Sequence, residues 1–255
     1  MSASTGTGDY DAQDGFDARF EWGTEGMRRL APLSEVVVIV DVLRFTTAVD
    51  VAVSRGAVVY PYHSRDDDAA DAYAHEVGAQ LAEWRGAAAG ERPYSLSPVS
   101  LLRLAPGERL VLPSPNGATL AFLAAETPAT VFAGCLRNAT AVASAVRQQG
   151  GVVAVTAAGE RWGRDSGSLR PAVEDLLGAG AILAALAPAT PSPEAHAAMA
   201  AFQAARPHLR AQLLACVSGR ELVQKGFARD VEIAAEYDAS RTVPVLRERA
   251  FRAAD

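Results

Sequence analysis

An aspartate and an arginine follow directly on a run of five apolar residues early in the chain. The run, residues 36–40, is rich in β-branched side chains and predicts a short strand that is buried on both faces. Asp41 and Arg44 come next, and the hydroxyls of Thr46 and Thr47 are suited to cap a following helix. Ligands of open α/β sheets bind at the carboxyl ends of strands, where helix N-termini favour anions. The segment therefore predicts a binding site, unless Asp41 only caps the loop and Arg44 is its surface ion-pair partner.

Three further loops are expected to present the same kinds of groups. They follow predicted strands at residues 109–112, 130–133 and 152–156. If these strands and the first are parallel neighbours, their loops converge at one edge of the sheet. Carboxylates, amides and Arg side chains gathered there suit a hard cation such as Mg²⁺ together with a phosphate or a sulfonate. The groups, in chain order, are Asp41 and Arg44; Ser114, Asn116 and Gly117; Cys135, Arg137 and Asn138; and Glu160, Arg161 and Arg164.

Other kinds of site have less support in the sequence. A zinc site is disfavoured, because the four histidines show no ligand spacing and the two cysteines lie far apart. The sequence also lacks a Walker phosphate loop, a dinucleotide-binding fingerprint and a nucleophile elbow. Cys135 leaves two alternatives open. A helix N-terminus and Arg137 could depress the pKa of its thiol, or it is a small buried residue in a tight turn.

Short predicted strands and helices alternate along the chain, which favours an α/β fold. We expect three layers, α/β/α, around a mostly parallel or mixed central sheet. Residues 1–17 are rich in Ser, Gly, Thr and Asp and are predicted to form a disordered N-terminal segment. Residues 18–255 are predicted to form a single domain whose part beyond residue 193 is mostly helical.

The bulk composition limits the partners of the chain. Its 255 residues are 49% hydrophobic and carry a net charge of -6, which argues against nucleic acid as a partner. No apolar run approaches the length of a membrane span, and the first residues show no signal-peptide pattern. With only two cysteines we expect a cytoplasmic protein without disulfides. The sequence leaves open whether it forms a homo-oligomer.

Several motifs occur in an order that is found in a known family. Residues 40–47, Val-Asp-Val-Leu-Arg-Phe-Thr-Thr, are similar to the family segment Ile-Asp-Val-Leu-Arg-Ala-Thr-Thr. The motifs that follow are Asn-Gly-Ala-Thr at 116–119, Gly-Cys-Leu-Arg-Asn-Ala at 134–139, Ala-Gly at 158–159, Glu-Asp at 174–175, Gly-Ala-Gly at 178–180, and segments 218–222, 227–233 and 243–244. Together, from about residue 34 to about residue 248, they resemble the 2-phosphosulfolactate phosphatase family.

This resemblance implies an α/β/α fold and a Mg²⁺-dependent phosphatase. The family reaction is the hydrolysis of 2-phospho-3-sulfolactate to 3-sulfolactate and phosphate. Two segments depart from the family pattern. The glutamate of its Gly-Glu-Arg segment could be Glu83 or Glu91, and Ser95-Leu96-Ser97-Pro98 stands where the family has Gly-Asn-Ser-Pro. The positions that carry over by motif are Asp41, Arg44, Asn116, Asn138, Glu174 and Asp175.

The predicted site combines metal ligands with groups that bind a phosphorylated acid. Asp41 and one of Glu174 or Asp175 are expected to bind Mg²⁺, or one of them to orient the attacking water as a base. Arg44 and Arg161 are expected to hold phosphate or sulfonate, while Asn116, Asn138 and backbone N–H groups stabilise the phosphoryl oxygens. The further substrate-binding candidates are Gly117, Cys135, Arg137 and Ser97.

Three alternatives remain open at this point. Glu174 and Asp175 could simply compensate the dipole of a helix in its first turn. The chain could be a non-catalytic protein that binds small anions on the same fold, as the altered loop at residues 95–98 would allow. It could also be a phosphatase for a different small phosphoester.

Overall fold

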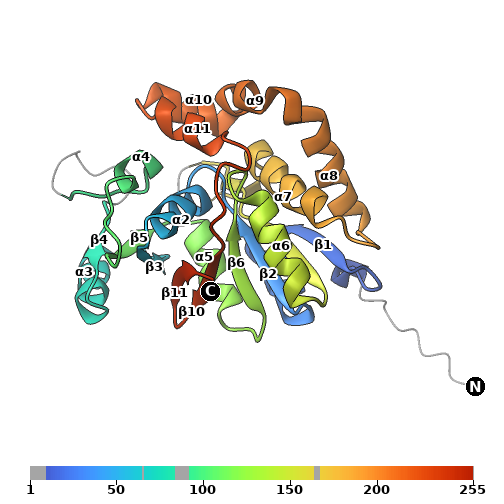
Figure 1. Ribbon diagram of the computed structural model, residues 1–255, viewed down its shortest axis with the longest axis horizontal. Coiled ribbons are helices and arrows are strands. Elements are labelled where there is room, and N and C mark those ends of the chain that lie inside the picture. Colours follow the sequence, from blue (N-terminus) through green and yellow to red (C-terminus); the bar gives the residue numbers. More distant parts are fainter. Residues whose placement is uncertain (1–9, 65, 84–91, 164–166, 255) are drawn as a thin grey trace, which may run out of the picture.

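The computed structural model describes residues 10–64, 66–83, 92–163 and 167–254. Within these residues nine strands form one mixed sheet with helices on both faces, which confirms the expected α/β fold (Figure 1). The strand order is β1-β7-β2-β6-β10-β11-β3-β5-β4. None of the described helices is long and apolar enough to cross a membrane.

The first half of the sheet consists of four parallel strands. They are β1 (Ala18–Trp22), β7 (Val153–Ala157), β2 (Val36–Val40) and β6 (Thr130–Gly134), in that spatial order. All five residues of β2 are buried, as its unbroken apolar run predicts. Its register with both neighbours places the loops after β2, β6 and β7 at the same edge of the sheet.

The second half of the sheet runs in the opposite direction. It contains β3 (Val58–Tyr62), β5 (Arg109–Pro113) and β4 (Gln80–Leu81), which are parallel to one another. A C-terminal hairpin of β10 (Pro244–Arg247) and β11 (Ala250–Ala253) pairs antiparallel with both β6 and β3. Three successive antiparallel pairings therefore separate the two halves. The condition that all four strands are parallel neighbours is not met, because β6, the hairpin and β3 lie between β2 and β5.

Two apolar clusters fill the space between the sheet and its helices. Val36, Val38 and Val40 of β2 pack in the cluster that includes α6, α7 and α8. Val37 and Ile39 pack in the other cluster, with α1, α2 and α5 and with residues of β3 and β5. Because both halves of the sheet contribute to this second cluster, they lie around α2 and α5. The alternation in β2 is the period-two pattern of a strand that is covered on both faces.

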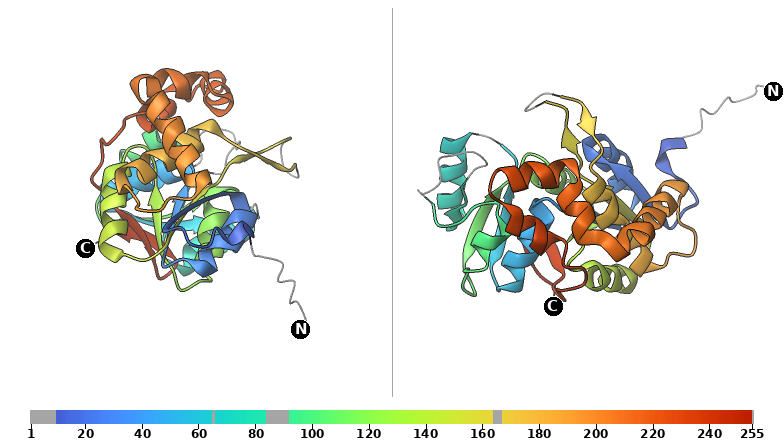
Figure 2. Two further views of the ribbon diagram at one scale, coloured as in Figure 1. Left: turned by 90° about the vertical axis from the view of Figure 1, so that its right-hand side faces the viewer. Right: turned by 90° about the horizontal axis from the view of Figure 1, so that it is seen from above.

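Helices cover both faces of the sheet and one of its ends. Those that flank the sheet are α1 (Gly23–Leu30), α2 (Phe45–Ser54), α3 (Asp67–Glu76), α5 (Gly117–Ala124), α6 (Ala139–Gln149), α7 (Val173–Leu186) and α8 (Pro193–Ala205). Figure 1 shows α9 (Leu209–Ala215), α10 (Val217–Gln224) and α11 (Ala228–Ala234) grouped at one end of the sheet. The short elements are α4 (Pro98–Leu101), the 3-10 turns Tyr10–Ala12, Ala31–Leu33 and Arg206–His208, and a separate hairpin of β8 (Glu160–Arg161) and β9 (Leu169–Arg170). Figure 2 shows this hairpin extending from the body of the molecule.

The N-terminal segment differs from the expectation of disorder through residue 17. Residues 1–9 lie outside the described residues, but residues 10–17 are packed on the domain. The side chain of Gln13 donates to the carbonyl of Phe20 and accepts from its N–H, and Ala12 is buried. Asp17 accepts N–H groups from Ala189 and Thr190. The partners of Asp17 lie on a remote segment, which a polar composition does not reveal.

The close packing of α7 against α8 can be tested by a substitution at Gly180. A Cβ atom on Gly180 would lie 2.0 Å from the carbonyl oxygen of Ala198. Gly180→Ala should therefore lower the free energy of unfolding by about 1–3 kcal/mol, measured by urea denaturation. Alanine favours helix over glycine by about 1 kcal/mol where space is open, so a more stable variant would contradict this packing.

Candidate active site

The carboxylate of Asp41 joins the beginnings of two helices. Its Oδ1 accepts the N–H of Phe45, the first residue of α2, at 3.2 Å. Its Oδ2 accepts the N–H of Gly117, the first residue of α5, at 2.9 Å. Asp41 is nearly buried, with 6% exposure. The positive ends of both helices therefore stabilise this negative charge at the carboxyl end of β2.

The two threonines after Asp41 brace its turn instead of capping the helix. Helix α2 begins at Phe45, with Arg44 in the N-cap position, so Thr46 and Thr47 lie inside the first turn. The hydroxyl of Thr46 donates to the carbonyl of Asp41 at 2.9 Å, and that of Thr47 donates to the carbonyl of Val42 at 2.8 Å. The predicted capping role is wrong, because the Asp41 side chain already receives the N–H of Phe45.

A glycine is required where α5 meets Asp41. A Cβ atom on Gly117 would lie 2.3 Å from a ring carbon of Phe45 and 2.8 Å from Oδ2 of Asp41. Both distances are shorter than any stable contact, so the missing side chain allows the helix N-terminus to reach the carboxylate. The structure thus brings Asp41 and Gly117 into direct contact although they come from opposite halves of the sheet.

Asp175 connects the turn after β2 to the loop after β7. It lies in the first turn of α7, and its two oxygens accept the N–H groups of Val42 at 2.7 Å and Gly159 at 2.9 Å. Burial and then the negative charges of Asp41 and Glu174 raise the pKa of Asp175 well above its usual range. Acidic groups are therefore crowded around a carboxylate whose oxygens both accept hydrogen bonds.

Cys216 lies next to this acidic group at the N-terminus of α10. Burial and then the charge of Glu174 raise the pKa of the Cys216 thiol to about 12. The thiol is therefore protonated at neutral pH and adds no further negative charge. Its proximity shows that the C-terminal helices approach the start of α7, which the sequence analysis did not predict.

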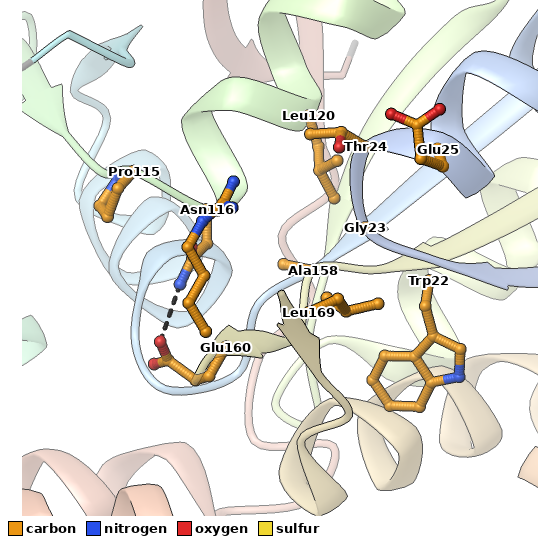
Figure 3. A pocket seen from close by; sticks show the side chains of 11 residues that line it. Trp22, Gly23, Thr24, Glu25, Pro115, Asn116, Leu120, Ala158, Glu160 and Leu169 are labelled. Carbon is orange, nitrogen blue, oxygen red and sulfur yellow. Dashed lines mark hydrogen bonds between the residues drawn. The ribbon is translucent and has the colours of Figure 1, made fainter. Parts of the chain in front are cut away.

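A pocket of about 170 Å³ lies between the starts of α1 and α5 and the hairpin β8–β9. Asn116 and Glu160 face one another across it, and the Asn116 amide donates to the Glu160 carboxylate at 3.0 Å (Figure 3). Arg161 also lines the pocket. The full lining is Trp22, Gly23, Thr24, Glu25, Pro115, Asn116, Leu120, Ala158, Glu160, Arg161 and Leu169. The pocket thus adjoins Gly117 and combines one Arg, one amide and helix N-termini, which suit an anion, with the carboxylates of Glu25 and Glu160.

Arg44 and Ser97 meet at a residue that the sequence analysis did not single out. Nη1 of Arg44 donates to Asp230 at 2.5 Å, and the hydroxyl of Ser97 donates to the other Asp230 oxygen at 2.5 Å. The guanidinium also lies over the ring of Phe227, 4.6 Å from its centre. Asp230 stands in the first turn of α11, where a carboxylate is expected simply for the helix dipole, so the sequence carries no separate signal for this pairing.

The loop after β6 is held by structural partners. Asn138 accepts the N–H of Cys135 at 2.8 Å and donates to two backbone carbonyls, and Arg137 is paired with Asp50 and Glu236. Cys135 is fully buried, and burial is the main cause that raises the pKa of its thiol to about 12. Of the two alternatives for Cys135, the geometry supports a small buried residue in a turn. Substrate contacts of these three residues remain predictions.

The carboxylates of the candidate site suit Mg²⁺ that is bound by one or two protein groups, with water and substrate as the other ligands, better than a site made of protein groups alone. Among the described residues, no group of three or more His, Cys, Asp or Glu side chains is placed to hold a metal alone. Mg²⁺ is usually bound by one or two carboxylates, water and substrate phosphate, so the donor chemistry of Asp41, Glu174 and Asp175 suits it.

The two candidates for the glutamate of the family Gly-Glu-Arg segment are Glu83 and Glu91. Glu83 accepts the backbone N–H of Arg92, while Glu91 and Arg164 lie outside the described residues.

The chain is similar to known proteins over most of its length, including the loops that carry the candidate site residues. The family model for 2-phosphosulpholactate phosphatase matches residues 25–249. A protein of Carboxydothermus hydrogenoformans that is described as a probable 2-phosphosulfolactate phosphatase is 30% identical over 214 residues, which are 82% of this chain and 85% of that protein. The matched range includes the loops after β2, β5, β6 and β7 as well as Asp230.

The contact between Gly117 and Asp41 predicts that one substitution affects activity more than stability. Gly117→Ala should push α5 away from Asp41 and lower kcat by at least about tenfold, since misplacing a site group by 1 Å can cost more than that. Gly180→Ala is the matched control, because its clash lies between α7 and α8. We expect that control to be less stable but to keep its kcat per folded molecule. Equal kcat values for Gly117→Ala and the unmodified protein would contradict the role of this contact.

Proposed function

The chain belongs to the 2-phosphosulfolactate phosphatase family, and we propose that it hydrolyses 2-phospho-3-sulfolactate to 3-sulfolactate and phosphate with Mg²⁺. The observation that carries this proposal is the placement of Asp41 between two helix N-termini, with Asp175 close to it and the pocket beside Gly117. The two helix ends suit a bound anion, and the paired carboxylates suit a hard cation.

Charge balance supports the need for a cation. The proposed substrate carries three acidic groups, a phosphate, a sulfonate and a carboxylate. The site is acidic as well, because Asp41, Glu160, Glu174 and Asp175 lie in or near it, so the substrate and the site repel each other. Asp175 also has a raised pKa although both of its oxygens accept N–H groups, an arrangement that favours the charged carboxylate. A divalent cation resolves both conflicts, because it compensates the crowded carboxylates and the phosphate together.

The residues of the chain supply positioning and charge stabilisation. Asp41 with Glu174 or Asp175 would hold Mg²⁺, which supplies charge neutralisation at the phosphoryl oxygens. Asn116 and the N–H groups at the start of α5 bind the phosphoryl oxygens, and Arg161 binds the sulfonate or carboxylate end. A water attacks phosphorus, the phosphorus–oxygen ester bond breaks, and the alcohol oxygen of sulfolactate takes a proton. The carboxylate that does not hold the metal orients this water as a base.

Arg44 remains a candidate for anion binding although it is paired. A guanidinium has five N–H donors, and Asp230 receives a hydrogen bond from Nη1. Its backbone forms part of the turn that positions Asp41, because Thr46 donates to the Asp41 carbonyl and Ala48 to that of Arg44. We therefore propose Arg44 as a phosphate-binding group.

The proposed reaction is tested with a panel of phosphorylated three-carbon acids and sugars, with Mg²⁺ or with a chelator. We expect phosphate release from 2-phospho-3-sulfolactate that requires Mg²⁺ and is lost with the chelator. Faster phosphate release from another ester would show that this other ester, and not 2-phospho-3-sulfolactate, is the substrate. Ligand-induced thermal stabilisation without any release would instead indicate an anion-binding protein.

Replacing Asp41 tests its role in the chemistry. Asp41→Asn keeps the size of the side chain but removes its charge, so kcat should fall by at least about a hundredfold. One of the two N–H acceptors is also lost, and stability should drop by about 1 kcal/mol. Asp66→Ala is the matched control, because Asp66 caps α3 through the N–H of Ala69 away from the site. Near-normal kcat in Asp41→Asn would remove Asp41 from the mechanism.

A further inference from the structure

Three remote segments of the chain converge on one buried carboxylate. Asp230 comes from α11, Arg44 from the turn between β2 and α2, and Ser97 from the start of α4. Their exposures are 1%, 5% and 6%, so the Asp230 carboxylate itself is almost completely buried. Each oxygen of Asp230 receives its own donor, from Arg44 and from Ser97. The plane of the carboxylate is therefore fixed by two partners.

The guanidinium of Arg44 is held from two directions. Asp230 binds it at the edge, and Phe227 supports its face at 4.6 Å from the ring centre. Both residues belong to the start of α11, since Phe227 is in its N-cap position. A guanidinium that is bound at edge and face has little freedom to turn. The orientation of the guanidinium as a whole is therefore set by α11.

Stability alone is a weak explanation for this arrangement. A buried ion pair loses hydration on both partners, and its replacement by apolar residues is often neutral or stabilising. A fixed guanidinium is useful where an anion must be bound in one position, because the cost of ordering it is met in advance. Arg44 directly precedes Phe45, whose N–H binds Asp41, so the backbone of Arg44 belongs to the turn of the candidate site.

We propose that Asp230 is a positioning residue for the phosphatase site, which holds Arg44 in the orientation that binds the phosphate group. This inference rests on the proposed role of Arg44 in anion binding. Ser97 orients the Asp230 carboxylate, and Phe227 supports the guanidinium. The start of α11 thereby becomes part of the binding apparatus although its carboxylate does not touch the substrate.

The test compares three variants by calorimetric titration with inorganic phosphate and by steady-state kinetics. Asp230→Asn should weaken phosphate binding and raise KM by roughly 10- to 100-fold, with a smaller change in kcat, because a charge-assisted contact orients the anion site. Phe227→Leu, at a partly exposed position, should weaken phosphate binding by roughly threefold or more. The matched control is Asp17→Asn, which removes a carboxylate that accepts the N–H groups of Ala189 and Thr190 and contacts none of the proposed binding residues, so phosphate binding should be unchanged.

Each outcome decides the proposal. A folded Asp230→Asn with unchanged phosphate affinity and KM would overturn it and leave Asp230 as a structural tether of α11. If Asp230→Asn does not fold, Phe227→Leu decides, and unchanged phosphate affinity in that variant would equally overturn the proposal. The two proposals fail in different measurements. The proposed function fails if the unmodified protein does not turn over 2-phospho-3-sulfolactate, whereas the role of Asp230 fails if the variants bind phosphate as tightly as the unmodified protein.

Discussion

The arrangement of the site depends on one carboxylate that accepts hydrogen bonds from two helix N-termini. Asp41 ends the most buried strand and receives the first N–H of α2 and the first N–H of α5. Helix α5 follows β5, which belongs to the half of the sheet that runs opposite to β2. The contact therefore joins the two halves, and only a glycine at position 117 leaves room for it. Asp175, at the start of α7, connects the turn after β2 to the loop after β7, because it accepts the N–H groups of Val42 and Gly159.

The two buried aspartates of the site have different surroundings. Asp41 faces two helix ends, which stabilise a negative charge, whereas Asp175 is buried beside two other acidic side chains and has a raised pKa. Such divergent environments are typical of catalytic carboxyl groups and cost stability that the rest of the fold must supply. Here the two closely packed apolar clusters on either face of the sheet supply it.

Much of the fold can be predicted from the sequence, and the missed parts have physical reasons. An unbroken apolar run reveals β2, and the part beyond residue 193 is mostly helical, as predicted. The hairpin β10–β11 is missed because its turn uses Glu248 and Arg249 at positive φ, +50° and +66°, where Asn-Gly is the usual signal. That omission also hides the reversal of direction between the halves of the sheet. Of the site, Asp41, Asn116 and Gly117 follow from strand ends, but Asp230 does not, since a first-turn carboxylate gives no sign of a distant partner.

The most direct test of this account is a crystal structure of the protein with Mg²⁺ and either phosphate or 3-sulfolactate. The account predicts the metal against Asp41 and Glu174 or Asp175, with the anion between the start of α5 and Arg44. A metal and an anion bound elsewhere, with the hydrogen bonds of Asp41 to α2 and α5 unchanged, would show that this carboxylate has a structural role alone.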